Sequence, residues 1–228
     1  MPSSPLSVLD HDHRRAAWCW AALAILTSGA LTALGVLLRG PFVAPSASDS
    51  SQAFVQWAAG PTLVPAYLII IGGTAIGTFG YLGLWPAIGT RLAAWGALLA
   101  ALGYQFLLAL FGVLLSFHAF AILGGQAGAA AAAAAFGGPA GVVLQALSGL
   151  NIIGSIVLAV AIWRSAARPR WSGVPLAIAP LLLALPLALA LELFGCGLLV
   201  LAGAAMLWGM RAPQPAEAAI GSALRRAT

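Results

Sequence analysis

Residues 65–85 form an uncharged stretch, PAYLIIIGGTAIGTFGYLGLW, that is long enough to cross a lipid bilayer as a helix. Within it, Gly73, Gly77 and Gly80 are spaced three or four residues apart, so they fall on one face of that helix. Small residues on one face let another helix backbone come close, and close packing is what drives helix association in lipid. The stretch therefore predicts the central packing helix of a polytopic membrane protein.

The composition of the whole chain agrees with a membrane location. Of its 228 residues, 62% are hydrophobic and 7% are charged, whereas a soluble domain carries about 25% charged residues. A soluble fold could not bury so much apolar surface, so a lipid bilayer is the predicted partner. The basic residues are all arginines that lie between apolar segments instead of forming one patch, and we therefore expect no nucleic-acid binding.

The fold class that we predict is all-α, with six transmembrane helices in a single domain over residues 16–210. A polar N-terminus over residues 1–15 and a polar tail over residues 211–228 flank this domain. Residues 174–210 are too long for one crossing, so we divide them at Glu192, Gly195 and Gly197, with Pro180 and Pro186 kinking the first half. The predicted helices span about 16–38, 63–85, 92–118, 142–163, 174–191 and 194–210.

The distribution of arginines predicts the orientation. Six helices place both termini on one side, and nine of the ten arginines then fall on that side, leaving only Arg39 opposite. The positive-inside rule makes the arginine-rich side cytoplasmic. Because an alanine-rich chain with arginine in place of lysine is typical of a GC-rich bacterial genome, we expect the bacterial inner membrane.

The segments between the helices give further expectations. Phe54 and Trp57 share one face of a predicted short helix, which we expect to lie on the membrane surface, with a lid over a substrate site as the alternative. Residues 124–141 are almost entirely glycine and alanine and could form a short helix without chemistry. Gly96, Ala100 and Gly103 share a face of the third helix, which is therefore the first candidate to pack on the second helix.

Few residues inside the apolar region could carry chemistry. Glu192 is its only acidic residue, and residue counting places it at the non-cytoplasmic side together with His118 and Ser148. Such a set could supply a nucleophile, its base and an orienting carboxylate. The alternative is structural, with Ser148 bonding between helices, Glu192 capping a wet turn and His118 lying at the interface. The candidates for ligand binding are the polar side chains at mid-depth, namely Tyr104, Gln105 and Asn151.

The run Leu147–Ser148–Gly149 resembles the GxSG motif of rhomboid intramembrane proteases over these few residues. Ala146 replaces the first glycine, and His118 precedes the serine whereas rhomboids have the reverse order, so the resemblance does not extend to membership. Metal sites are not expected, because Asp10, His11, Asp12 and His13 are typical of a solvated terminus, and Cys19 and Cys196 should lie at opposite faces. No cofactor is predicted.

In layout, the chain resembles small six-helix bacterial membrane proteins, with arginine-marked inner loops, Phe54 and Trp57 in the first outer loop, and a glycine-rich second helix. That resemblance implies no particular activity. The abundance of packing signals over chemical groups favours a non-enzymatic structural, interaction or small-molecule- or lipid-binding module, with a membrane protein or a second copy as possible partner. The alternatives are a facilitator or channel for a small neutral solute, and an outer-leaflet hydrolase that uses Ser148, His118 and Glu192.

Overall fold

The computed structural model describes residues 5–43, 51–165, 169–184 and 189–210, and every regular element within them is a helix. Pro186 and the 211–228 tail lie outside the described residues. In chain order the elements are α1 (Pro5–Arg39), α2 (Ser51–Ala58), α3 (Leu63–Ile88), α4 (Arg91–Gly137), α5 (Pro139–Ser148), α6 (Leu150–Arg164), the 3₁₀ helix η1 (Arg170–Ser172), α7 (Gly173–Leu183) and α8 (Leu189–Gly209).

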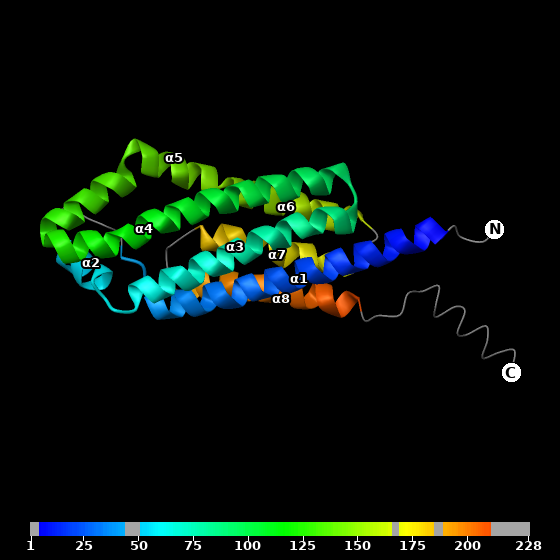
Figure 1. The fold of residues 1–228 in the computed structure, drawn as a ribbon, viewed down its shortest axis with the longest axis horizontal. Helices are drawn as coiled ribbons and strands as arrows, with labels where there is room; N and C mark the ends of the chain where they lie inside the picture. The colour runs from blue at the N-terminus through cyan, green and yellow to red at the C-terminus, as the bar shows by residue number, and fades with distance from the viewer. Residues whose placement is uncertain (1–4, 44–50, 166–168, 185–188, 211–228) are drawn as a thin grey trace, which may run out of the picture.

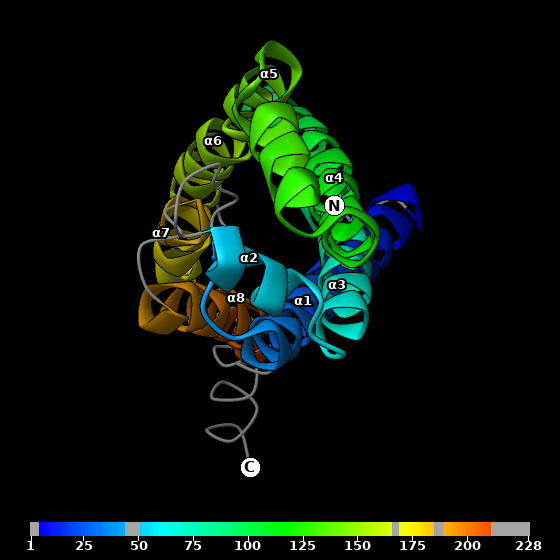
Figure 2. The same ribbon diagram turned by 90° about the vertical axis from the view of Figure 1, so that its left-hand side faces the viewer.

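Among the described elements, α1, α3, α4, α6, α7 and α8 pack in a closed ring, which Figure 2 shows end-on. Going around it, α1 packs on α3, α3 on α4, α4 on α6, α6 on α7, α7 on α8, and α8 again on α1. The start of α1 and the end of α8 lie at the same end of this ring (Figure 1), which we call the arginine end because α4 begins there with Arg91 and α6 ends there with Arg164. The opposite end carries α2 and is called the α2 end.

Five of the helical segments are long and apolar enough to span a membrane. They are Asp12–Arg39, Leu63–Ile88, Arg91–Gly137, Pro139–Arg164 and Leu189–Gly209, while Arg170–Leu183 is apolar but shorter. Large apolar side chains such as Phe79, Leu98 and Phe194 are exposed on the outside of the ring. The chain is therefore built as a multi-pass membrane protein.

Several helix boundaries differ from those expected. The first helix begins at Pro5 and not near residue 16, because the polar residues 5–15 are also helical. The fourth expected helix is divided at Gly149 into α5 and α6. The fifth ends at Leu183 instead of 191, while α8 begins at Leu189, so Glu192 lies in the first turn of a helix and not in a connecting turn.

The largest difference concerns α4, which continues past the expected end at residue 118. At Gly125 the backbone turns with φ 52° and ψ −124°, a conformation that glycine adopts without strain. The following arm returns so closely that a Cβ on Gly128 would collide with the carbonyl oxygen of Phe120. The glycine- and alanine-rich segment thus forms the second arm of a helical hairpin at the α2 end.

α4 packs on α3 as expected, but the glycine-rich face of α3 lies mainly against α1. A Cβ on Gly77 would lie 2.6 Å from the Ser28 hydroxyl, and one on Gly80 would lie 2.8 Å from Ile25 Cγ1. Gly73 similarly faces Thr32. The small residues of α4 serve a different contact, because Gly96 meets the backbone of Leu158 and Gly103 that of Asn151, both in α6. Two separate pairs of helices therefore use the close approach that glycine permits.

Candidate ligand-binding cavity

A cavity of about 430 Å³ lies inside the ring, toward its α2 end. Its walls are mostly aliphatic and aromatic side chains, with a few polar groups among them. This combination of an apolar wall and sparse polar groups is typical of small-molecule sites, as is the volume. The polar groups are those of Thr32, Arg39, Thr74, Tyr104, Gln145, Ser148, Asn151 and Glu192.

An aromatic cluster covers the cavity at the α2 end. Phe54 of α2 packs edge-on against Phe117 of α4 with ring centroids 5.6 Å apart, and Trp57 packs against Phe42 at 5.5 Å. Phe136, in the returning arm of α4, contacts Phe42 and Phe117. Phe42 and Phe136 also line the cavity, so the cluster is its ceiling. Because Phe54 is fully buried, α2 does not present its apolar face to the membrane surface as expected.

His118 holds α2 in this position. Its ring nitrogen Nδ1 lies 2.8 Å from the carbonyl oxygen of Ala58, the last residue of α2. A carbonyl oxygen can only accept, so this ring nitrogen carries the proton and donates it. The bond satisfies an otherwise unpaired carbonyl at the end of a helix.

A buried ion pair forms one wall of the cavity. Nη2 of Arg39 donates to both carboxylate oxygens of Glu192, at 2.9 and 2.7 Å. The two side chains are 6% and 8% exposed, so water does little to stabilise either charge. Arg39 also donates from Nε to the carbonyl oxygen of Gly40 and lies 5.7 Å from the centre of the Phe42 ring, where a cation is attracted to the aromatic face.

Each charge of this ion pair lies at a helix end whose dipole stabilises it. Arg39 is the last residue of α1, where the helix dipole is negative, and Glu192 lies in the first turn of α8, where it is positive. Gly40 adopts a positive φ of 71° and donates its N–H to the carbonyl of Val36, which closes α1 directly at Arg39. The pair therefore joins the end of α1 to the start of α8.

Tyr104 and Asn151 form the polar floor of the cavity. The Asn151 amide oxygen accepts a hydrogen bond of 3.2 Å from the Ser155 hydroxyl, and the Tyr104 ring packs against Tyr81 with centroids 5.2 Å apart. Beyond them, the arginine half of the ring is filled by a cluster of buried apolar side chains that includes Ile25, Leu158 and Met206. The floor is therefore backed by packed protein and not by open space.

The structure gives each of the three candidate catalytic residues a partner outside the set. Ser148 donates to the carbonyl oxygen of Gln145 in its own helix, His118 binds the carbonyl of Ala58, and Glu192 is paired with Arg39. No hydrogen bond joins any two of the three among the described residues. Ser148 and Glu192 line the cavity, whereas His118 does not.

The candidate ligand-binding residues are placed in two different environments. Tyr104 and Asn151 are buried and line the cavity. Gln105, the next residue along α4, is exposed on the outside of the ring. Adjacent helical residues point about 100° apart, so a tyrosine that faces inward leaves its neighbour facing outward.

The Arg39–Glu192 pair was not predicted, although the sequence contains a signal for it. Arg39 was the only arginine assigned to the non-cytoplasmic side, and Glu192 the only acidic residue within the apolar region, at that same side. Two opposite charges in an apolar environment are expected to pair. The cavity could not be predicted from the sequence in the same way, because its apolar lining residues are of the same types as those of the packed core.

No family model matches this chain, and neither a curated protein nor a solved structure matches it. Within the described residues, histidine, cysteine and carboxylate side chains nowhere gather in a group of three that could hold a metal ion. Cys19 and Cys196 are both free thiols.

Proposed function

We propose that this chain is a multi-pass membrane protein that binds an uncharged, largely apolar molecule in the cavity at its α2 end and does not transform it. The observation that carries the proposal is the cavity itself, with aliphatic and aromatic walls and a few polar groups, among them the ion pair and the Tyr104–Asn151 floor. A molecule with an apolar body and hydrogen-bonding groups at its ends matches that distribution.

The charge state of the ligand follows from the ion pair. Arg39 and Glu192 already neutralise each other, and a buried charge left without a partner is unstable. A charged ligand would have to separate them, whereas an uncharged one leaves them paired and can accept or donate hydrogen bonds at the floor. The cavity is therefore best suited to a neutral ligand.

Binding is favoured over both alternatives. A hydrolase that uses Ser148 would need a base near its hydroxyl, but His118 binds the carbonyl of Ala58. A facilitator would need a route past the floor, where Tyr81, Tyr104 and the apolar cluster fill the ring. The absence of solute flux in vesicles, together with retained ligand binding, is the expected result for a binding module.

The ligand can be sought by mass spectrometry of an organic extract of the purified protein. Ala146 lies at the exposed rim of the cavity, so Ala146→Trp should obstruct it and deplete the bound compound. Ala109→Trp is the matched control, because Ala109 is exposed on α4 and does not line the cavity. Recovery of no compound that distinguishes Ala146→Trp from Ala109→Trp would refute the proposal.

We infer further that the segment over η1 and α7 completes six crossings, with the arginine end in the cytosol of a bacterial cell. The arginines at that end, including Arg91 and Arg164, support this orientation through the positive-inside rule. Reporter fusions after residues 164 and 228 should be active inside, and one within residues 44–50 outside. A reporter after residue 164 on the same side as one within residues 44–50 would overturn this topology.

A further inference from the structure

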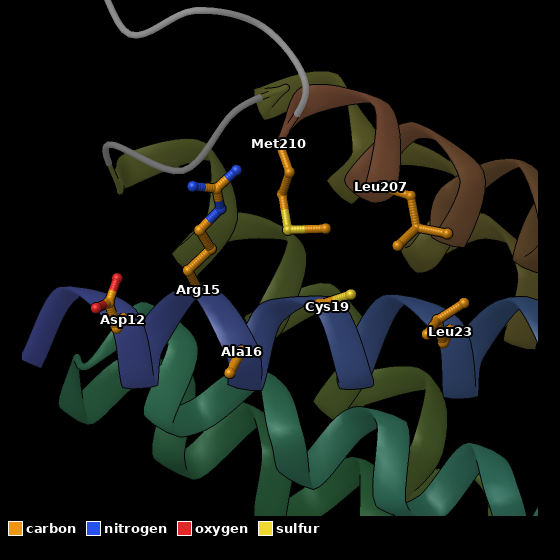
Figure 3. Close-up of a pocket in the computed structure, with 7 residues that line it drawn as sticks. All are labelled: Asp12, Arg15, Ala16, Cys19, Leu23, Leu207 and Met210. Atoms are coloured by element: carbon orange, nitrogen blue, oxygen red, sulfur yellow. The ribbon is translucent and has the colours of Figure 1, made fainter. Parts of the chain in front are cut away.

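A second hollow lies on the outside of the ring at the arginine end, between α1 and α8 (Figure 3). This groove, with a volume of about 660 Å³, is separate from the central cavity and shares no lining residue with it. It is lined by Asp12, Arg15, Ala16, Cys19, Leu23, Leu207 and Met210.

The groove runs from polar to apolar along the axis of α1. Asp12, Arg15, Cys19 and Leu23 follow one another at spacings of three and four residues, so they share one face of the helix. At about 1.5 Å per residue, roughly 12 Å separates Arg15 from Leu23 along the axis. Leu207 of α8 and Met210, which directly follows that helix, form the opposite wall, as Figure 3 shows. Going from the centre of the membrane outward, the groove therefore presents apolar side chains, then a guanidinium, then a carboxylate.

The two charged side chains of the groove have no partner among the described residues. Neither Asp12 nor Arg15 forms an ion pair or a hydrogen bond with another described side chain or backbone group. Both are exposed, and Figure 3 shows both projecting from the groove side of α1. The walls are nevertheless fixed, because the Trp18 indole nitrogen donates to the carbonyl oxygen of Met206 at 3.2 Å and joins the two helices beside the groove.

We propose that this groove binds a phospholipid with an ethanolamine headgroup. The phosphate accepts hydrogen bonds from the Arg15 guanidinium, the primary ammonium donates to the Asp12 carboxylate, and the acyl chain lies along Leu23 and Leu207. The order of charges selects this headgroup, since the carboxylate lies one helical turn outside the guanidinium, as the ammonium of the lipid lies beyond its phosphate. The glycerol headgroup of phosphatidylglycerol places no cation beside Asp12, and a choline headgroup has no N–H to donate.

The test is a lipid titration of the full-length, delipidated protein by native mass spectrometry, with phosphatidylethanolamine, phosphatidylcholine and phosphatidylglycerol in turn. The wild-type protein should bind the ethanolamine lipid about fivefold more tightly than the choline lipid, as expected for one exposed ion pair. Asp12→Asn should remove this preference while keeping phosphate-dependent binding, and Arg15→Gln should weaken binding of all three lipids. Arg91→Gln is the control, since Arg91 lies at the same end outside the groove.

Three results would overturn the proposal. The first is equal affinity of the wild-type protein for ethanolamine and choline lipids. The second is a preference for phosphatidylglycerol that Asp12→Asn leaves unchanged. The third is a dimer whose lipid count does not depend on Arg15, which would assign the groove to a second copy of the chain.

Discussion

Breaking the Arg39–Glu192 pair should destabilise the protein more than almost any other single change of charge. Glu192→Gln keeps the shape of the side chain but leaves the Arg39 guanidinium without a counter-charge in an environment where it is only 6% exposed. The loss of one partner of a buried pair costs about 3–5 kcal/mol of folding free energy. For a chain of this length, that corresponds to a melting temperature lower by roughly 6–20 °C.

A double-mutant cycle separates the pair from the packing of its side chains. Arg39→Met alone should be destabilising, because it leaves Glu192 charged and unpaired. Arg39→Met combined with Glu192→Leu should recover most of the loss, since apolar residues of similar volume replace a buried pair at little cost. The melting temperature in detergent, followed by tryptophan fluorescence, gives all four corners of the cycle. Single-mutant losses that simply add in the double mutant would refute a coupled, desolvated pair.

The remaining predictions concern contacts between helices. Gly103→Val should reduce the fraction of protein that elutes as a folded species in size-exclusion chromatography, because its side chain would collide with the backbone of Asn151, whereas Gly112→Val has open space around it and should elute like the wild type. His118→Phe should cost about 1 kcal/mol of stability and make the end of α2 more susceptible to limited proteolysis, since the Ala58 carbonyl loses its donor; unchanged cleavage would contradict this role. Trp18→Phe should lower the melting temperature by about 2–4 °C, because the indole no longer donates between α1 and α8.

The sequence predicted well those features that depend on composition along a single helix. Long uncharged stretches such as residues 65–85 require lipid around them, and the apolar spans of α1, α3 and α8 follow directly. Small residues at helical spacing, such as Gly73 and Gly77, also identify a face that another helix approaches. Such residues do not identify which helix approaches that face, because α1 and α4 both contain small residues. The partner is determined by the order in which the helices are arranged around the ring.

Local turns were harder to predict than the helices. Gly125 lies in a segment made almost entirely of glycine and alanine, and nothing in its composition distinguishes the residue of that segment that has a positive φ. The end of α7 was misplaced because residues 184–191 are as apolar as the helix before them. Hydropathy measures preference for lipid and not helical continuity, so it cannot locate a break within an apolar run.

In the candidate site, too, single residues could be predicted from one helix, whereas their arrangement depends on how the helices pack together. Tyr104 and Asn151 could be selected as polar residues at mid-depth, but the structure places them on one floor only because Gly103 and Gly154 let α4 and α6 approach within backbone contact. The ion pair likewise depends on α1 and α8 being neighbours, although 153 residues separate its two members. Polarity is thus concentrated where helices distant in sequence meet, at the α2 half of the ring, while the arginine half is filled with apolar side chains. The interior of the ring thus has one hollow half and one packed half, and this asymmetry supports the proposed binding site over a conduction path.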